Sequence, residues 1–238
     1  MTQDKTVPAA VLGLSVALGL TAGGFLIGRA VQAVRAADRY VTVKGFAERE
    51  VAADLVVWPI AFNTTGNDLA LLQDKLEAGA KKVGAYLESR GFSPQEYSLS
   101  SPRVTDFEAQ GIRGPDRPTS RYVAEATLTL RSGKVSAVRE AMQHSGDLIK
   151  EGVALVRSYE QNTTYLYTAL DHIKPEMIAE ATKDARRAAE RFAVDSGSQV
   201  GAIRNAQQGY FNIEDRDPFS PEFKKVRVVT TVQYFLKD

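Results

Sequence analysis

A long apolar run opens the chain. From Val7 to Gly28 no residue carries a charge. As a helix this run would extend for about 33 Å, and the hydrocarbon core of a bilayer is about 30 Å thick. The run therefore predicts a membrane-spanning helix, whose residues include Val7, Leu12, Leu18, Phe25 and Gly28.

A cleaved signal peptide is the competing interpretation of this run, because Val31-Gln32-Ala33 is an acceptable cleavage tripeptide. Signal peptides usually have an apolar region of about 7–15 residues, so this one would be too long. We interpret residues 1–37 as an uncleaved membrane anchor. The flanking basic residues leave its orientation open, since Lys5 lies before the run and Arg29 and Arg35 lie after it.

Beyond the anchor, the spacing of apolar residues alternates between that of strands and that of helices. Strands are predicted at about 39–47, 54–64, 97–107 and 121–131, because β-branched and aromatic residues alternate with polar ones there. Helices are predicted at about 67–90 and 134–144, where apolar residues recur at spacings of three and four. In the longer helix, Asn67 is the predicted first cap and Gly91 follows the end.

The second half of the chain has a similar order of elements. We predict a strand at 154–164, a helix at 175–196, strands at 202–212 and 226–236, and a polar loop at 214–222. Pro175 suits the first position of that helix. Its expected buried face consists mostly of small residues, namely Met177, Ala181, Ala185, Ala188 or Ala189, and Phe192.

The two halves match at an offset of about one hundred residues. Asn63-Thr64-Thr65 corresponds to Asn162-Thr163-Thr164, and helix corresponds to helix. We therefore expect an α+β fold of duplicated β-α-β-β units with mixed sheets covered by helices, preceded by one N-terminal transmembrane helix. The expected domains are an anchor at 1–37 and a folded region at 38–238, whose halves are about 38–145 and 146–238.

Composition excludes several functional classes. The chain has 238 residues and no cysteine, which excludes disulfides, a cysteine nucleophile and cysteine-ligated metals. Thirty basic and 29 acidic residues give a formal charge of +1, and the anchor holds only a few of them. A domain so close to neutral has no electrostatic basis for binding nucleic acid.

Catalytic chemistry has little support in the sequence. His144 and His172 are the only histidines, and no nucleophile elbow or phosphate-binding glycine loop is present. We expect no catalytic, cofactor-binding or metal-binding residue. The acidic side chains near residue 215 lack the spacing of a calcium loop and alternate with basic ones, which indicates a solvated loop. Those acidic residues are Glu214, Asp215, Asp217 and Glu222, and the basic ones are Arg216, Lys224 and Lys225.

Three aromatic residues are candidates for contact with a partner. Phe219 and Phe223 lie in a loop that also contains Pro218 and Pro221, and aromatic residues are enriched at protein interfaces. The third is Trp58, the only tryptophan, for which the domain core is an equally good location.

Two motifs resemble the SIMPL-domain family. Val43-Lys44-Gly45-Phe46-Ala47 followed by Ala53-Asp54 is similar to its opening signature, with alanines at 47 and 53 where the family usually has glycine and proline. The stretch from Glu180 to Gly201 is similar to its alanine-rich helix and closing glycine motif, and is the more specific match. The resemblance covers about residues 39–238 and marks a divergent member.

The resemblance implies a bacterial envelope protein that oligomerises, with a loose link to envelope or oxidative stress and no established catalytic residues. It also favours an N-terminus inside the cell and a domain in the periplasm or outside, with a secreted or periplasmic protein if the N-terminal segment is cleaved. We therefore expect a non-enzymatic, single-pass protein of the cytoplasmic membrane, with membrane lipid and further copies of itself as partners. The alternative is a periplasmic module that binds a small ligand or peptide.

Overall fold

The computed structural model describes residues 6–37, 39–111, 118–156 and 162–237. Beyond the first helix, the chain forms an α+β fold that divides into two compact units. The α5 unit comprises Met1–Ala47, Pro175–Phe211 and Arg227–Asp238, and the α2 unit comprises Glu48–Lys174 and Asn212–Val226.

The first helix, α1, spans Thr6–Ala37. Its stretch Gly13–Ala30 is long and apolar enough to cross a membrane, and none of it is buried against the protein. Leu18 and Phe25 are each 63% exposed. Val7 and Leu12 lie in the same helix, but their side chains fall outside the described residues. Length and composition of this kind suit a membrane anchor and a signal sequence alike.

A six-stranded sheet forms the centre of the α2 unit. Its strands follow the order β3-β5-β2-β6, with β4 also on β5 and β7 also on β2. Every one of these pairs is antiparallel, whereas the sequence suggested mixed sheets. The strands are β2 (Leu55–Gly66), β3 (Tyr97–Leu99), β4 (Arg103–Asp106), β5 (Tyr122–Ser132), β6 (Ala154–Leu155) and β7 (Thr164–Leu166).

Helix α2 (Leu69–Ser89) packs its apolar face on this sheet through Leu72, Leu76 and Leu87. This helix is capped one residue later than the sequence indicated. Asp68, and not Asn67, caps it, because the Asp68 carboxylate accepts hydrogen bonds from the N–H groups of residues 70 and 71 at 2.8 and 3.0 Å. The shorter helices of the unit are η1 (Pro94–Glu96), α3 (Val135–Gln143) and α4 (Gly146–Lys150).

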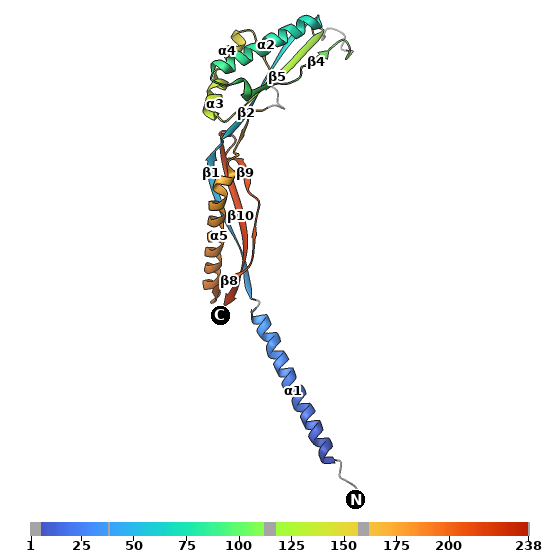
Figure 1. The fold of residues 1–238 in the computed structure, drawn as a ribbon, viewed down its shortest axis with the longest axis vertical. Coiled ribbons are helices and arrows are strands. Elements are labelled where there is room, and N and C mark those ends of the chain that lie inside the picture. The colour runs from blue at the N-terminus through green and yellow to red at the C-terminus, as the bar shows by residue number, and fades with distance from the viewer. Residues whose placement is uncertain (1–5, 38, 112–117, 157–161, 238) are drawn as a thin grey trace. The chain divides into compact units, whose positions relative to one another are not determined.

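A second, four-stranded sheet has one long helix beside it, and most of both belongs to the α5 unit (Figure 1). Its strand order is β1-β10-β8, and β9 also pairs with β10. The helix is α5 (Leu170–Asp195), and the strands are β1 (Tyr40–Ala52), β8 (Gln199–Gln208), β9 (Asn212–Asp215) and β10 (Phe223–Lys237). The α2 unit contains β9 and the ends of β1, α5 and β10 that continue into it.

The two compact units do not correspond to the two halves predicted from the sequence, which meet near residue 145. After β1 the chain enters the α2 unit, and it returns to the α5 unit along α5. The reason is non-local pairing, because β1 shares its sheet with β10, which is the last strand of the chain. The internal repeat that the sequence suggested is a separate matter and stays a prediction.

Candidate functional site

Gly45 lies where α5 crosses β1. A Cβ atom on residue 45 would stand 2.1 Å from the Ala181 carbonyl oxygen and 2.2 Å from the Ala185 nitrogen, so only glycine allows this approach. Ala181 and Ala185 are fully buried, and their small side chains let the helix lie directly on the strand. The small-residue face of α5 is therefore used inside the protein and offers no surface to a partner.

One carboxylate fixes the same crossing. The Phe46 N–H donates to the Asp184 carboxylate at 3.1 Å, and the Arg187 guanidinium donates to it at 2.9 Å. These two bonds, the first being the stronger cause, hold the pKa of Asp184 below its ordinary value.

Further along α5, Ala193 is buried and Phe192 is 50% exposed, so the prediction that Phe192 belongs to the buried face is wrong. The buried residue next to Ala189 is four positions on, at 193, one turn further along the same side of the helix.

Asp54, the acidic residue of the opening motif, binds the chain just ahead of α5. Its carboxylate accepts from the Thr168 N–H at 2.8 Å, from the Thr168 hydroxyl at 3.0 Å and from the Ala169 N–H at 2.8 Å. These bonds satisfy donors that the start of a helix would otherwise leave unpaired. They explain why α5 begins at Leu170, with Pro175 inside it, five residues ahead of the predicted start.

The closing glycine motif turns the chain from α5 into β8. Gly197 has a φ of 65° and follows the last helical turn, and the Ser198 N–H donates to the Ala193 carbonyl at 2.8 Å. Gly201 lies against β10, where a Cβ atom would stand 3.0 Å from the Phe235 carbonyl oxygen. The motif residues thus set the backbone path around α5. Periodicity alone could not reveal the role of Gly201, because it depends on Phe235, which is distant in the sequence.

The three aromatic candidates have different surroundings. Phe219 is 93% exposed in the loop between β9 and β10. Phe223 is half-buried, with the Arg216 guanidinium 4.4 Å from its ring centroid. Trp58 is 8% exposed and lies in the core of the α2 unit, opposite Leu130 on the neighbouring strand. Of the three, Phe219 presents the most accessible apolar surface to a partner.

Ion pairs occupy the acidic loop. Lys224 binds Asp215, Arg216 binds Asp217 at 3.0 Å, and Arg139 binds Glu222 at 3.0 Å. The Arg216 bond, with the Phe219 N–H as a second cause, lowers the pKa of Asp217. Within the described part of the chain, no group of three or more histidine, aspartate or glutamate side chains could hold a metal ion. The ion-paired groups are only partly solvated, because Lys224 is 8% exposed and the Glu222 side chain is 16% exposed.

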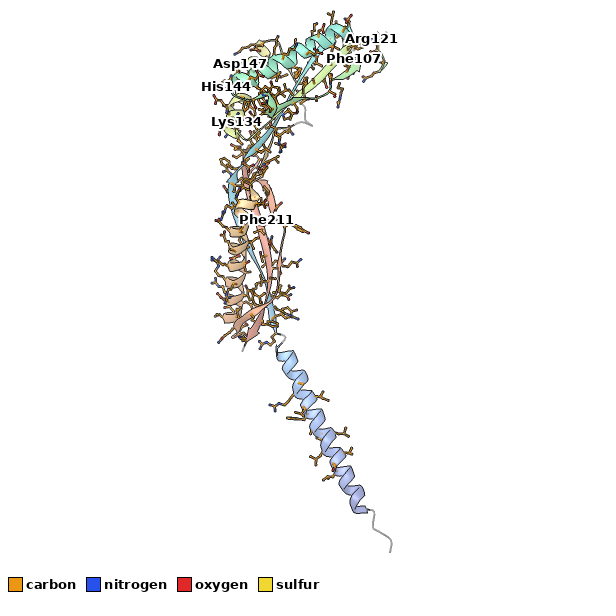
Figure 2. The ribbon with its side chains drawn as sticks, in the orientation of Figure 1. Phe107, Arg121, Lys134, His144, Asp147 and Phe211 are labelled. Atoms are coloured by element: carbon orange, nitrogen blue, oxygen red, sulfur yellow. The ribbon has the colours of Figure 1, made fainter. Side chains whose placement is uncertain are left out.

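The histidines lie in separate places. His144 follows α3, with its Nδ1 2.8 Å from the Glu140 carbonyl oxygen, and His172 lies in the first turn of α5. Figure 2 labels His144 near Asp147, whose nearest cation is Lys150 at 2.8 Å. Both contacts are local, and a backbone bond from the Asp147 N–H to the His144 carbonyl at 3.0 Å links the end of α3 to α4.

Strand β8 is the most exposed of the strands with ten residues or more. Eight of its ten residues are exposed, including Ile203 at 52%. It pairs with β10 along one edge and is the last strand in the β1-β10-β8 order. Edge strands are commonly protected by charged residues or proline, yet β8 contains no proline and a single charged residue, Arg204. Tyr210, two residues after the strand, is 99% exposed.

The α2 unit also has an open groove between α2 and β3. Its volume is about 400 Å³, and its lining includes Ala80, Gly84, Tyr97, Leu99 and Leu128. The Tyr97 hydroxyl donates to Glu88 at 2.8 Å, and Leu99 is 49% exposed. This groove therefore combines an apolar wall with the Glu88 carboxylate.

Comparison with known proteins adds one match. A family model described as SIMPL, a protein of unknown function (DUF541), matches residues 41–234. The matched region contains both motifs and every strand of the two sheets at least in part. No curated protein matches this chain.

Proposed function

The chain belongs to the SIMPL family, whose members are described as proteins of unknown function, and on that premise we propose that it is a non-enzymatic, membrane-anchored protein of the cell envelope. In this proposal α1 holds it in the cytoplasmic membrane as a single span. The domain lies on the periplasmic or outer side and assembles with further copies of itself. A role in envelope or oxidative stress belongs to the same proposal.

The open edge of β8 carries the proposal of self-assembly. A strand with unpaired backbone groups along one edge can add a strand from another chain, and the backbone bonds then supply affinity. Ile203 adds apolar surface to that strand, and its single charge gives little repulsion between copies. Two copies of β8 could pair with each other, or β8 of one copy could pair with another edge of the next.

The motif residues support a non-enzymatic role. Gly45, Asp54, Gly197 and Gly201 each have a packing or capping task in the fold. Such tasks account for the motifs without a reaction. This observation favours a scaffold over an enzyme.

We also propose that the two halves derive from one repeated unit. The first half runs β2, α2, β3, β4 and β5, and the second runs β7, α5, β8, β9 and β10. In each, a strand precedes a long helix, and three strands follow it. The order of elements supports a repeat.

A binding module remains the second candidate, and the groove beside Leu99 favours it. In that case a small apolar ligand or a peptide would lie between α2 and β3. The two candidates predict different solution behaviour, because a binding module works as a monomer and a scaffold does not.

The test is the solution mass of the full chain in detergent, measured by light scattering. We expect a discrete assembly of several copies. Ile203→Lys should reduce the assembled mass, since it places a like charge on each copy of the edge. Leu99→Lys is the matched control, because Leu99 is also about half exposed and lies on a short strand of the other unit.

Three outcomes are informative. Loss of assembly with Ile203→Lys, together with unchanged assembly in the control, supports the proposal. A monomeric parent chain rules out self-assembly and favours the binding module. An assembled Ile203→Lys variant of unchanged mass rules out β8 as the contact.

A further inference from the structure

We propose that the α1-proximal end of the α5 unit contacts the phospholipid headgroups of the membrane that holds α1. This end consists of the start of β1 with the last turn of α5 and the end of β10. The inference rests on the proposed function, because it requires α1 to be inserted in a membrane. It adds a lipid-contacting surface on the folded domain itself.

Chain length brings this end close to the membrane. The apolar stretch of α1 ends at Ala30, and α1 continues to Ala37. Those seven residues add about 10 Å of helix, and the headgroup layer of one leaflet is about 5–8 Å thick. Since β1 begins at Tyr40, three residue steps of at most about 3.8 Å each separate it from the end of α1. Tyr40 therefore lies within about 15 Å of the headgroups.

Hydrogen bonds join the elements at this end. The Leu236 N–H donates to the Arg39 carbonyl at 2.9 Å, which links the end of β10 to the start of β1. The Arg39 guanidinium donates to the Ser198 hydroxyl at 3.4 Å, and Ser198 directly follows the last turn of α5. Figure 1 shows the end of α5 and the C-terminus at the same end of the sheet. All three elements thus approach the membrane together.

The exposed side chains at this end have the character of a membrane interface. Val194 is 77% exposed, Phe192 is 50% exposed and Tyr40 is 44% exposed. Aromatic residues prefer the headgroup level of a bilayer, where the ring and the polar atoms both find a suitable environment. Apolar side chains so exposed in water would gain free energy from burial among headgroups and upper acyl chains.

Basic side chains accompany these residues. The Arg204 guanidinium lies 4.0 Å from the centroid of the Tyr40 ring, and Lys237 is exposed at the end of β10. Asp195, also exposed, is an acidic residue at this end. Lipid phosphates attract arginine and lysine near a membrane surface. The combination of apolar, aromatic and basic side chains favours headgroups over a protein partner.

The absence of cysteine permits a direct test by single-cysteine labelling. The full chain would be reconstituted in vesicles of phosphatidylethanolamine and phosphatidylglycerol. Val194→Cys reports on the proposed contact after labelling with an environment-sensitive fluorophore. Tyr210→Cys is the control within the same unit, because it lies beyond the other end of β8, about 30 Å away along the strand. Leu18→Cys reports on insertion of α1.

Quenching by spin-labelled lipids is the measurement. The proposal predicts quenching at residue 194 at least about twofold stronger than at residue 210. Quenching at residue 18 combined with equal, weak quenching at 194 and 210 overturns this inference and leaves the anchor intact. No quenching at residue 18 overturns the anchor and this inference with it. Both surface positions are highly exposed, so neither cysteine should disturb folding.

Discussion

Gly45 in β1 and Ala181 in α5 are in direct backbone contact, because a Cβ atom on residue 45 would lie only 2.1 Å from the Ala181 carbonyl oxygen. The two residues are 136 positions apart, and each belongs to one of the two motifs that mark the family. Their contact fixes the helix on the first strand of the sheet. The two motifs therefore supply the two partners of one packing contact.

Gly45→Ala should destabilise the α5 unit strongly. The added methyl group has no room, since both nearby atoms belong to the backbone of α5 and cannot rotate away. Overpacking of this kind costs about 1–3 kcal/mol, and more where the backbone must move. Chemical denaturation of the full chain in detergent would measure the loss.

Gly146→Ala provides the matched control for that experiment. Gly146 is the first residue of α4, and a Cβ atom there would meet no heavy atom within 4 Å. The control should change the free energy of unfolding by no more than about 0.5 kcal/mol. Equal stability of the two variants would contradict the direct contact of β1 and α5.

Asp54→Ala should also destabilise the protein. It removes the acceptor of two N–H groups and one hydroxyl just ahead of α5. Loss of a helix cap costs about 0.5–2 kcal/mol, and here several donors lose their partner. Asp54→Asn should restore part of the stability, because it retains one carbonyl oxygen.

The control for Asp54 is Asp74→Ala, which alters an exposed carboxylate on α2. Thermal unfolding followed by circular dichroism compares the three variants. The capping role requires the order parent, Asp54→Asn, Asp54→Ala in falling stability. If Asp74→Ala were the least stable of the variants, the capping role of Asp54 would be refuted.

Much of the fold could be predicted from local patterns. The spacing of leucines located α2 to within two residues, and alternation located β2 and β5, because these elements bury one face against a single partner. The start of α5 could not be found in the same way. Its cap, Asp54, is 114 positions from Thr168, so no local pattern contains the signal.

The same distinction between local and non-local signals applies to the candidate site. Phe219 lies on the surface and Trp58 lies in the core, although the sequence made both of them candidates for contact with a partner. Strand β8 was expected from its sequence, but its exposure depends on its place at the end of the sheet. Phe192 was assigned to the buried face because residues 192 and 193 lie about 60° and about 40° to opposite sides of Ala189 around the helix, and the packing of α5 against β1 decides which of them is buried.

Phe219→Ser tests the loop between β9 and β10 as a partner contact. With the ring 93% exposed, the substitution should leave the free energy of unfolding within about 0.5 kcal/mol of the parent. If the ring contacts a second copy, the assembled mass in detergent should fall. Ser220→Ala is the control, since it changes the same loop without removing an aromatic ring. Equal masses for both variants would exclude Phe219 from the assembly contact.

Glu96 makes stability depend on pH in the acid range. The Ser132 hydroxyl at 2.6 Å, the Ser93 N–H at 2.8 Å and the Lys134 ammonium at 3.0 Å all donate to its carboxylate, which is one-fifth exposed. Figure 2 labels Lys134, which directly precedes α3. With the Ser132 bond as the largest cause, these contacts lower the pKa of Glu96 from 4.5 to about 2.

A carboxyl group whose pKa is lower in the folded state stabilises the protein at pH values above its unfolded pKa. The contribution of Glu96 should therefore be complete above about pH 4.5 and should disappear as the pH falls towards 2. The upper limit of this contribution is about 3 kcal/mol, and partial exposure to solvent reduces it.

Denaturation curves of the parent and of Glu96→Gln, measured at intervals between neutral pH and pH 2, would show the contribution of Glu96. The difference between the two proteins should shrink as the pH falls, because protonated Glu96 resembles glutamine. A difference that stays constant over this range would contradict the lowered pKa.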